Sequence, residues 1–188
     1  MRLFIALDVP EATRRALGDA IQKFRNVCRG AGWARAESVH VTLKFIGHVE
    51  EAKLPAIQNR LVEAKSSSPI EIVFRNFGFF PNERHPRVFW LGIEGGPNLT
   101  PLAAEIESKL EPLGIPRDAR TFKPHLTLAR FKTEEGLPKL RDTVASLAPP
   151  DFGLMIATEF HLYESVLDSS GAVHTKLASY PFVEGNAA

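Results

Sequence analysis

The hydrophobic and polar positions of this chain follow a helical period in some segments and a strand period in others. Apolar residues recur every three to four positions in four segments, which predicts amphipathic helices at 11–26, 51–65, 100–110 and 137–147. Between them lie short runs rich in β-branched and aromatic residues, which are typical of strands. We expect strands at 2–7, 33–35, 39–47, 70–74, 87–93, 124–128, 152–156, 159–167 and 173–178.

The order of these elements favours an α+β fold. Helices and strands mix without regular alternation, which indicates largely antiparallel sheets rather than a doubly wound parallel sheet. Runs of Ser, Gly and Pro at 66–69, 95–97 and 149–150 supply breaks between the elements. A length of 188 residues suits one domain or one bilobal unit. We therefore expect residues 1–188 to form a single bilobal domain.

The composition excludes several classes of protein. The chain has 23 basic and 22 acidic residues, so it is not a polycation suited to long duplexes. Its one cysteine, Cys28, cannot form an internal disulfide, which favours a reducing compartment. Apolar runs are too short to span a membrane, and the opening residues lack a secretory signal pattern. We expect a soluble cytoplasmic protein that does not associate with membranes.

A short phrase occurs twice in the chain. The sequence Val-His-Val-Thr-Leu around His40 returns as Pro-His-Leu-Thr-Leu around His125. Successive side chains of a strand point to opposite faces, so His40 and Thr42 share one face, as do His125 and Thr127. The apolar residues between them point into a core. Two imidazoles and two hydroxyls on separate strands can therefore converge on one small anionic centre.

These residue types suit acid–base chemistry at phosphorus. An imidazole titrates near neutral pH, so one histidine can act as a base while the other acts as an acid. Threonine hydroxyls can donate hydrogen bonds to the non-bridging oxygens as charge builds there. The alternative is structural: two half-buried strand histidines held by their neighbours. That alternative suits a lone His-x-Thr phrase better than it suits two matched ones.

Two cations near the phrases are candidates for holding a phosphate. Arg130 follows the second phrase, and a guanidinium matches phosphate oxygens well. Strict alternation places Arg130 on the face opposite His125, so it reaches the site only if the strand twists, bulges or ends there. Lys44 shares the parity of His40 and Thr42, so it either lines the site or is a solvated strand-end lysine.

Other features give weaker signals. Residues 117–132 hold five basic residues against Asp118, which indicates either local attraction for a polyanion or a solvated loop. Bases could stack on aromatic residues, although most of these are better explained by core packing; the candidates are Trp33, Phe45, Phe79, Phe80 and Phe122. The remaining histidines match no metal-ligand spacing; they are His48, His85, His161 and His174. The sequence also lacks a Gly-rich phosphate loop, so we expect no metal and no cofactor.

Over nearly its whole length the chain resembles the 2H phosphoesterases, a group named for two His-x-Thr/Ser phrases. More narrowly, it resembles the bacterial and archaeal RNA 2′,3′-cyclic phosphodiesterase branch, historically called 2′-5′ RNA ligase. The resemblance rests on residues 2–8, 40–47, 88–92, 123–130 and 160–165. It implies a bilobal fold in which two mostly antiparallel sheets face a central cleft, with helices on the outside. Each lobe would contribute one His phrase.

The resemblance also implies a reaction. An RNA with a 2′,3′-cyclic phosphate end, such as a tRNA fragment, would be hydrolysed to a 2′-phosphate without a metal. His40 and His125 would divide the acid and base roles, with Thr42, Thr127 and Arg130 on the phosphate. The sequence does not decide which histidine is the base; we favour His125 for the water and His40 as the acid. The reverse reaction would join a 5′ hydroxyl to the cyclic phosphate through a 2′-5′ linkage, without ATP.

Two other functions remain open at this point. One is a phosphodiesterase for small nucleotides, such as ADP-ribose cyclic phosphate or 2′-5′ oligonucleotides, which would use the same cleft and the same four residues. The other is an RNA-end binding module without turnover, in which the His-x-Thr pairs hold a phosphate but transfer no proton. We expect the protein to be a monomer.

Overall fold

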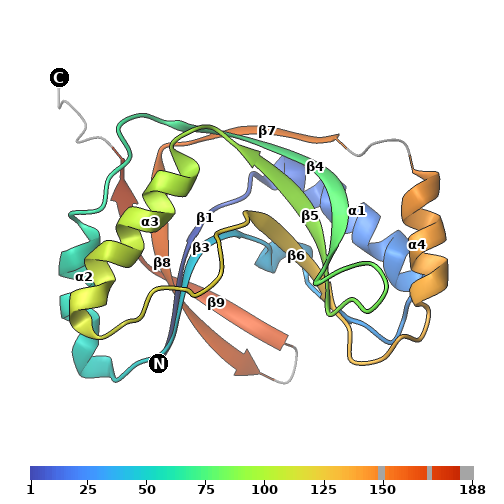
Figure 1. Cartoon of the computed structure of the whole chain (residues 1–188), viewed down its shortest axis with the longest axis horizontal. Coiled ribbons are helices and arrows are strands. Elements are labelled where there is room, and N and C mark those ends of the chain that lie inside the picture. Colours follow the sequence, from blue (N-terminus) through green and yellow to red (C-terminus); the bar gives the residue numbers. More distant parts are fainter. Residues whose placement is uncertain (148–150, 169–170, 183–188) are drawn as a thin grey trace.

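The strands of the computed structural model, which describes residues 1–147, 151–168 and 171–182, form two antiparallel sheets (Figure 1). The first sheet has the order β3-β1-β8-β9, and the second has the order β2-β6-β5-β4-β7. The bounds are β1 Arg2–Leu7, β2 Gly32–Trp33, β3 Val41–His48, β4 Ile70–Phe80, β5 Val88–Gly95, β6 His125–Arg130, β7 Asp151–Ala157, β8 Glu159–Asp168 and β9 Gly171–Pro181. The two sheets confirm the expected α+β class, and each sheet carries one His phrase.

The helices lie outside the sheets, at the two ends of the molecule (Figure 1). Their bounds are α1 Glu11–Val27, α2 Leu54–Leu61, α3 Leu99–Leu110 and α4 Leu137–Ser146, with 3-10 turns η1 Ala36–Ser38, η2 Glu51–Lys53 and η3 Glu111–Leu113. Helices α2 and α3 contact each other beside the first sheet, whereas α1 contacts α4 and β7 beside the second. In the described part of the chain, the helices are too short or too polar to cross a membrane.

Several boundaries differ from the sequence-based expectation. The helix expected at 51–65 is divided into the turn η2 and the shorter helix α2, which has Pro55 in its first turn. The strand expected at 33–35 is the two-residue β2, although the N–H of Ala34 still donates to the carbonyl oxygen of Leu128 beyond its end. The first strand of the central pair continues to Phe80, well beyond the expected end. Pro149 and Pro150, expected to end the last helix, lie outside the described residues.

The two sheets are built from interleaved rather than consecutive parts of the chain. Helix α1 precedes the first His phrase, yet its Phe24 packs edge-on against Phe77 and Phe89 of the second sheet, at 5.1 and 5.2 Å between ring centroids. Helix α3 precedes the second phrase, yet it packs on β3 of the first sheet. Strands β8 and β9 then return to the first sheet. The helix that precedes each phrase therefore covers the sheet that carries the other phrase.

Candidate active site

Residues of both His phrases line a single cleft of about 350 Å³. Thr42 of β3 and Thr127 of β6 both line it, so the first and second sheets share one cleft. His40 and Arg130 line it as well. His125 is not among the lining residues; it is the first residue of β6, two positions before Thr127, with its ring edge-on to Phe80 at 5.0 Å. The structure thus places four of the five candidate residues on the cleft and the fifth, His125, at the start of the strand that carries Thr127.

The segment between β2 and β3 keeps the two phrases close. Trp33 of β2 pairs with Ala129 of β6, and the N–H of Ala34 donates to the carbonyl oxygen of Leu128 at 2.8 Å. The chain then reaches His40 after six residues, which span at most about 20 Å when extended. Trp33 and residues of this segment, including Ala34 and Ser38, line the cleft. This short connector is hydrogen-bonded to the strand of the second phrase and leads directly into the first phrase, so it keeps the two phrases near each other.

Both phrases contain a β-bulge at the same place. On β3, Thr42 and Lys44 face consecutive residues of β1, so Leu43 is an extra residue in the ladder. On β6, Thr127 and Ala129 face consecutive residues of β5, so Leu128 is the extra residue. The burial of the five residues after each histidine follows the same order: buried, half-buried, buried, buried, exposed. The repeat therefore extends beyond the sequence phrase into the backbone.

These bulges decide which later side chains reach the cleft. Each one reverses the alternation, so the fifth residue after each histidine, Phe45 or Arg130, joins the face of the threonine. Both line the cleft. Lys44 is turned inward and is only 2% exposed, so both interpretations of it from the sequence are wrong. The bulge that would bring Arg130 to the site is present.

The two histidines are held by the same hydrogen bond. Nδ1 of His40 lies 2.9 Å from the carbonyl oxygen of Ser38, and Nδ1 of His125 lies 2.6 Å from the carbonyl oxygen of Lys123. In each case the partner is the residue two positions earlier. Because a carbonyl oxygen only accepts, Nδ1 carries the proton in both rings. Nε2 of each neutral imidazole is therefore left with a free lone pair.

Aromatic rings fix the orientation of both imidazoles. Phe4 stacks on His40 with the centroids 4.4 Å apart, and Tyr163 stacks on Phe4 at 5.2 Å. Phe80 holds His125 from its edge, and Trp90 packs on Phe80 at 5.0 Å. Trp90 lies over Gly78, where an added Cβ would come within 2.2 Å of the indole. Glycine at position 78 is thus needed for Trp90 to pack in this position.

The surroundings lower the pKa of both imidazoles. Burial is the main cause in each case: it lowers the pKa of His40 to about 4, and it lowers the pKa of His125 as well. The carbonyl contact acts in the opposite direction on both rings. The charge of Arg130 lowers the pKa of His125 further, and Arg14 does the same for His40. Both rings are therefore neutral at pH 7.

This burial predicts acid sensitivity of the fold. Between the unfolded pKa of 6.5 and the folded value of about 4, the unfolded chain binds a proton at His40 that the folded chain does not. The free energy of unfolding should therefore fall by about 1 kcal/mol per pH unit as the pH drops through this window. Denaturant unfolding at pH 7, 5.5 and 4.5 measures the slope. The His40→Gln variant should show a shallower slope, and an unchanged slope would contradict the assignment.

The aromatic candidates divide between the cleft and the core. Trp33 and Phe45 line the cleft, and Phe80 contacts His125. Phe79 is buried, and Phe122 packs against the hydrophobic core. Across the described residues, His, Cys, Asp and Glu side chains form no group of three that could hold a metal ion.

Sequence reasoning missed two residues of this site. Phe4 and His174 both line the cleft and pack on the ring of His40. Phe4 lies on β1 and His174 on β9, remote from both phrases in the sequence. Their positions follow from the strand order of the first sheet, and no local pattern in the sequence reveals that order.

Comparison with known proteins places the chain in a family. A family model described as the 2′-5′ RNA ligase superfamily matches residues 10–168. A protein of Archaeoglobus fulgidus named RNA 2′,3′-cyclic phosphodiesterase is 37% identical over 177 residues, which cover 94% of this chain and 98% of that protein. The crystal structure of TT0787 from Thermus thermophilus superposes with a TM-score of 0.77 at 33% identity, covering 97% of this chain and 98% of that one. E. coli LigT in complex with 3′-AMP superposes with a TM-score of 0.75 at 26% identity, covering 97% and 98%.

Proposed function

We propose that this chain, which belongs to the 2′-5′ RNA ligase superfamily, hydrolyses RNA 2′,3′-cyclic phosphate ends to 2′-phosphates. The observation that carries the proposal is the matched pair of His-x-Thr strands on one cleft, with the same bulge and the same Nδ1 contact in each. The name of the Archaeoglobus relative and the nucleotide bound by LigT support the substrate class.

In this mechanism the two imidazoles handle the protons. With Nδ1 committed to a carbonyl, Nε2 of one neutral ring can take a proton from the attacking water. The other ring must enter the reaction protonated, and a bound anionic phosphate raises the pKa of a nearby imidazole toward that state. We assign the water to His125 and the departing 3′ oxygen to His40. Each proton removed on one side of the phosphorus is thus matched by one delivered on the other.

Three further side chains stabilise the phosphate. Thr42 and Thr127 come from different sheets, and both line the cleft. They can donate hydrogen bonds to non-bridging oxygens from two directions. Arg130 brings a fixed positive charge that Phe45, at the matching position of the other sheet, does not. We propose that the phosphate is therefore held closer to the second sheet.

The direct test is incubation with a short RNA that ends in a 2′,3′-cyclic phosphate. We expect full turnover in EDTA and a product that carries a 2′-phosphate. Resistance of that product to a 3′-phosphate-specific phosphatase distinguishes it from the 3′ isomer. A 3′-phosphate product, or inhibition by EDTA that added metal reverses, would contradict the proposal.

The same experiment separates the alternatives. Small cyclic esters such as ADP-ribose cyclic phosphate can be added as competitors, and preferential hydrolysis of these would favour the small-nucleotide function. Tight binding of the RNA without turnover would favour a binding module. Addition of an RNA with a 5′ hydroxyl tests the reverse ligation, which needs no ATP because the strained cyclic ester supplies the energy. A tRNA fragment is one suitable RNA for these experiments. Because one chain carries both phrases, we propose a monomeric enzyme with a single bilobal domain.

A further inference from the structure

A third histidine faces the cleft, and the mechanism above does not use it. His174 of β9 lines the cleft together with His40 and Ala172. Its ring meets the ring of His40 edge-on, with the centroids 5.2 Å apart, and it meets Phe4 in the same way at 4.9 Å. It therefore lies in direct contact with the side chain that we place at the reacting phosphate.

The hydrogen bonding of His174 differs from that of the other two histidines. Nδ1 of His174 is buried and has no hydrogen-bond partner among the residues that the structure describes. In His40 and His125, by contrast, Nδ1 is paired with a backbone carbonyl. An unpaired buried nitrogen costs free energy, so a packing role alone would be served better by phenylalanine. Because Nδ1 is closed off, Nε2 is the ring nitrogen that can reach a molecule in the cleft.

The protonation of this ring follows from the same contacts. Burial lowers the pKa of His174, and the charge of Arg2 lowers it further, so the ring is neutral at pH 7. A neutral imidazole has one N–H. On Nδ1 that N–H would be a buried donor without an acceptor, whereas on Nε2 it can donate into the cleft. His174 thus presents a donor where His40 and His125 present lone pairs.

We propose that His174 is a substrate-binding residue whose Nε2–H donates a hydrogen bond to a non-bridging oxygen of the phosphate next to His40. The inference rests on the proposed function in taking the bound group to be a phosphate ester. It adds a neutral donor from the first sheet, where Phe45 stands at the position that matches Arg130. Such a donor would help to hold the phosphate within reach of His40.

The test compares two substitutions of His174 with a control. His174→Phe keeps the ring and its contacts with His40 and Phe4 but removes both nitrogens. His174→Gln keeps an N–H donor at about the reach of Nε2. His48→Ala removes an exposed histidine on β3 that does not line the cleft. Each protein is examined by calorimetric titration with 2′-AMP, by kinetics on the cyclic-phosphate RNA, and by thermal unfolding.

We expect His174→Phe to bind 2′-AMP about tenfold more weakly and to show a similar rise in KM, with kcat less affected. Its melting temperature should equal or exceed that of the parent protein, because no buried nitrogen is left unpaired. His174→Gln should recover part of the affinity, and His48→Ala should match the parent. Unchanged binding in His174→Phe, or a loss of binding that only accompanies a loss of thermal stability, would overturn the inference. If the parent protein binds 2′-AMP but turns over no RNA, the proposed function fails while the titration still decides the role of His174.

Discussion

Replacing either His40 or His125 with alanine is expected to lower kcat/KM for a cyclic-phosphate RNA by about 10²- to 10⁴-fold. Each substitution removes the Nε2 that we assign to one of the two proton transfers. The double variant should lose little more kcat/KM than the more impaired of the two single variants, since an acid and a base that act on one phosphorus work as a unit. Single-turnover rates at a fixed pH measure all three losses.

The control for these variants is His48→Ala, which alters an exposed histidine on the same strand that leads from the first phrase. It should leave kcat/KM unchanged. Thermal unfolding of each variant separates a loss of chemistry from a loss of fold. If either alanine variant keeps normal hydrolysis while folded, that histidine takes no part in proton transfer.

A leaving group that needs no proton separates the acid from the base. The substrate is a 3′-deoxynucleoside 2′-(4-nitrophenyl phosphate), from which 4-nitrophenolate departs as a stable anion. If His40 is the acid, His40→Ala should lose far less rate on this ester than on the cyclic phosphate. His125→Ala should stay equally impaired on both, because the water still needs a base. The reverse pattern would exchange the two assignments.

The repeated phrase is the strongest signal in the sequence because it places two reactive residue types, His and Thr, two positions apart on a strand. The spacing of His and Thr by two residues fixes their common face as soon as each segment is a strand. That reasoning stops at the threonine. A bulge at Leu43 or Leu128 has no signature in the residues themselves, and it reverses the parity of everything after it. Strict alternation therefore misplaced Lys44 and could assign Arg130 only on a condition.

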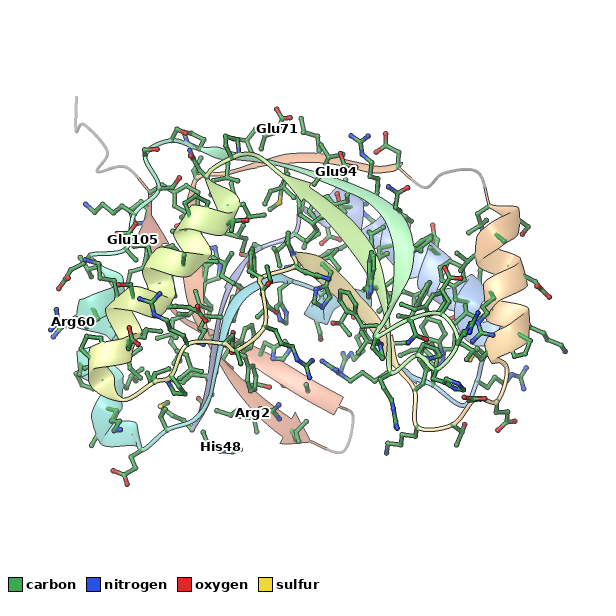
Figure 2. All side chains as sticks on the ribbon, in the orientation of Figure 1. Arg2, His48, Arg60, Glu71, Glu94 and Glu105 are labelled. Atoms are coloured by element: carbon green, nitrogen blue, oxygen red, sulfur yellow. The ribbon has the colours of Figure 1, made fainter. Side chains whose placement is uncertain are left out.

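Contacts across the sheet could not be predicted from the sequence, for a different reason. His174 meets His40 because β9, β8, β1 and β3 are neighbours in that order, which combines the two ends of the chain in one sheet. Local patterns predict that each of these strands exists but not which strands pair. Figure 2 shows the early strands β1 and β3 beside the late strands β8 and β9, with Arg2 and His48 labelled where β1 begins and β3 ends. A site built from such contacts needs the fold before all its members can be named.

A large stability effect is expected at the buried side chain of Lys44. Its Nζ donates to Oε1 of Glu107 on α3 at 2.8 Å and to the carbonyl oxygen of Pro116 at 2.8 Å, and it lies 3.2 Å from Oδ1 of Asp118. The N–H of Asp118 also donates to Oε1 of Glu107 at 2.8 Å. This group ties β3 to the start of the segment that leads to His125.

The two partners of this ion pair should respond unequally. Glu107→Ala leaves an ammonium that is 2% exposed without its main counter-charge, which costs about 3 kcal/mol of unfolding free energy. Lys44→Met keeps most of the buried volume and leaves carboxylates that water can reach, since Glu107 is 19% and Asp118 57% exposed. It should therefore cost clearly less. The double variant should be more stable than Glu107→Ala alone, because it leaves no buried ammonium with only the exposed carboxylate of Asp118 as its counter-charge.

Denaturant unfolding of the three variants at pH 7 measures these differences as one double-mutant cycle. A matched control is the solvated pair of Lys109, on the same helix, with Glu63, where the N–O distance is 3.2 Å. Lys109→Ala should produce no measurable change, because a solvated ion pair contributes little. Equal losses for Glu107→Ala and Lys44→Met would contradict the argument, since they would mean that Asp118 or water is enough to compensate the ammonium once Glu107 is gone. Because the unequal response depends on Lys44 being buried, it also tests the bulge at Leu43 that turns this side chain away from the cleft.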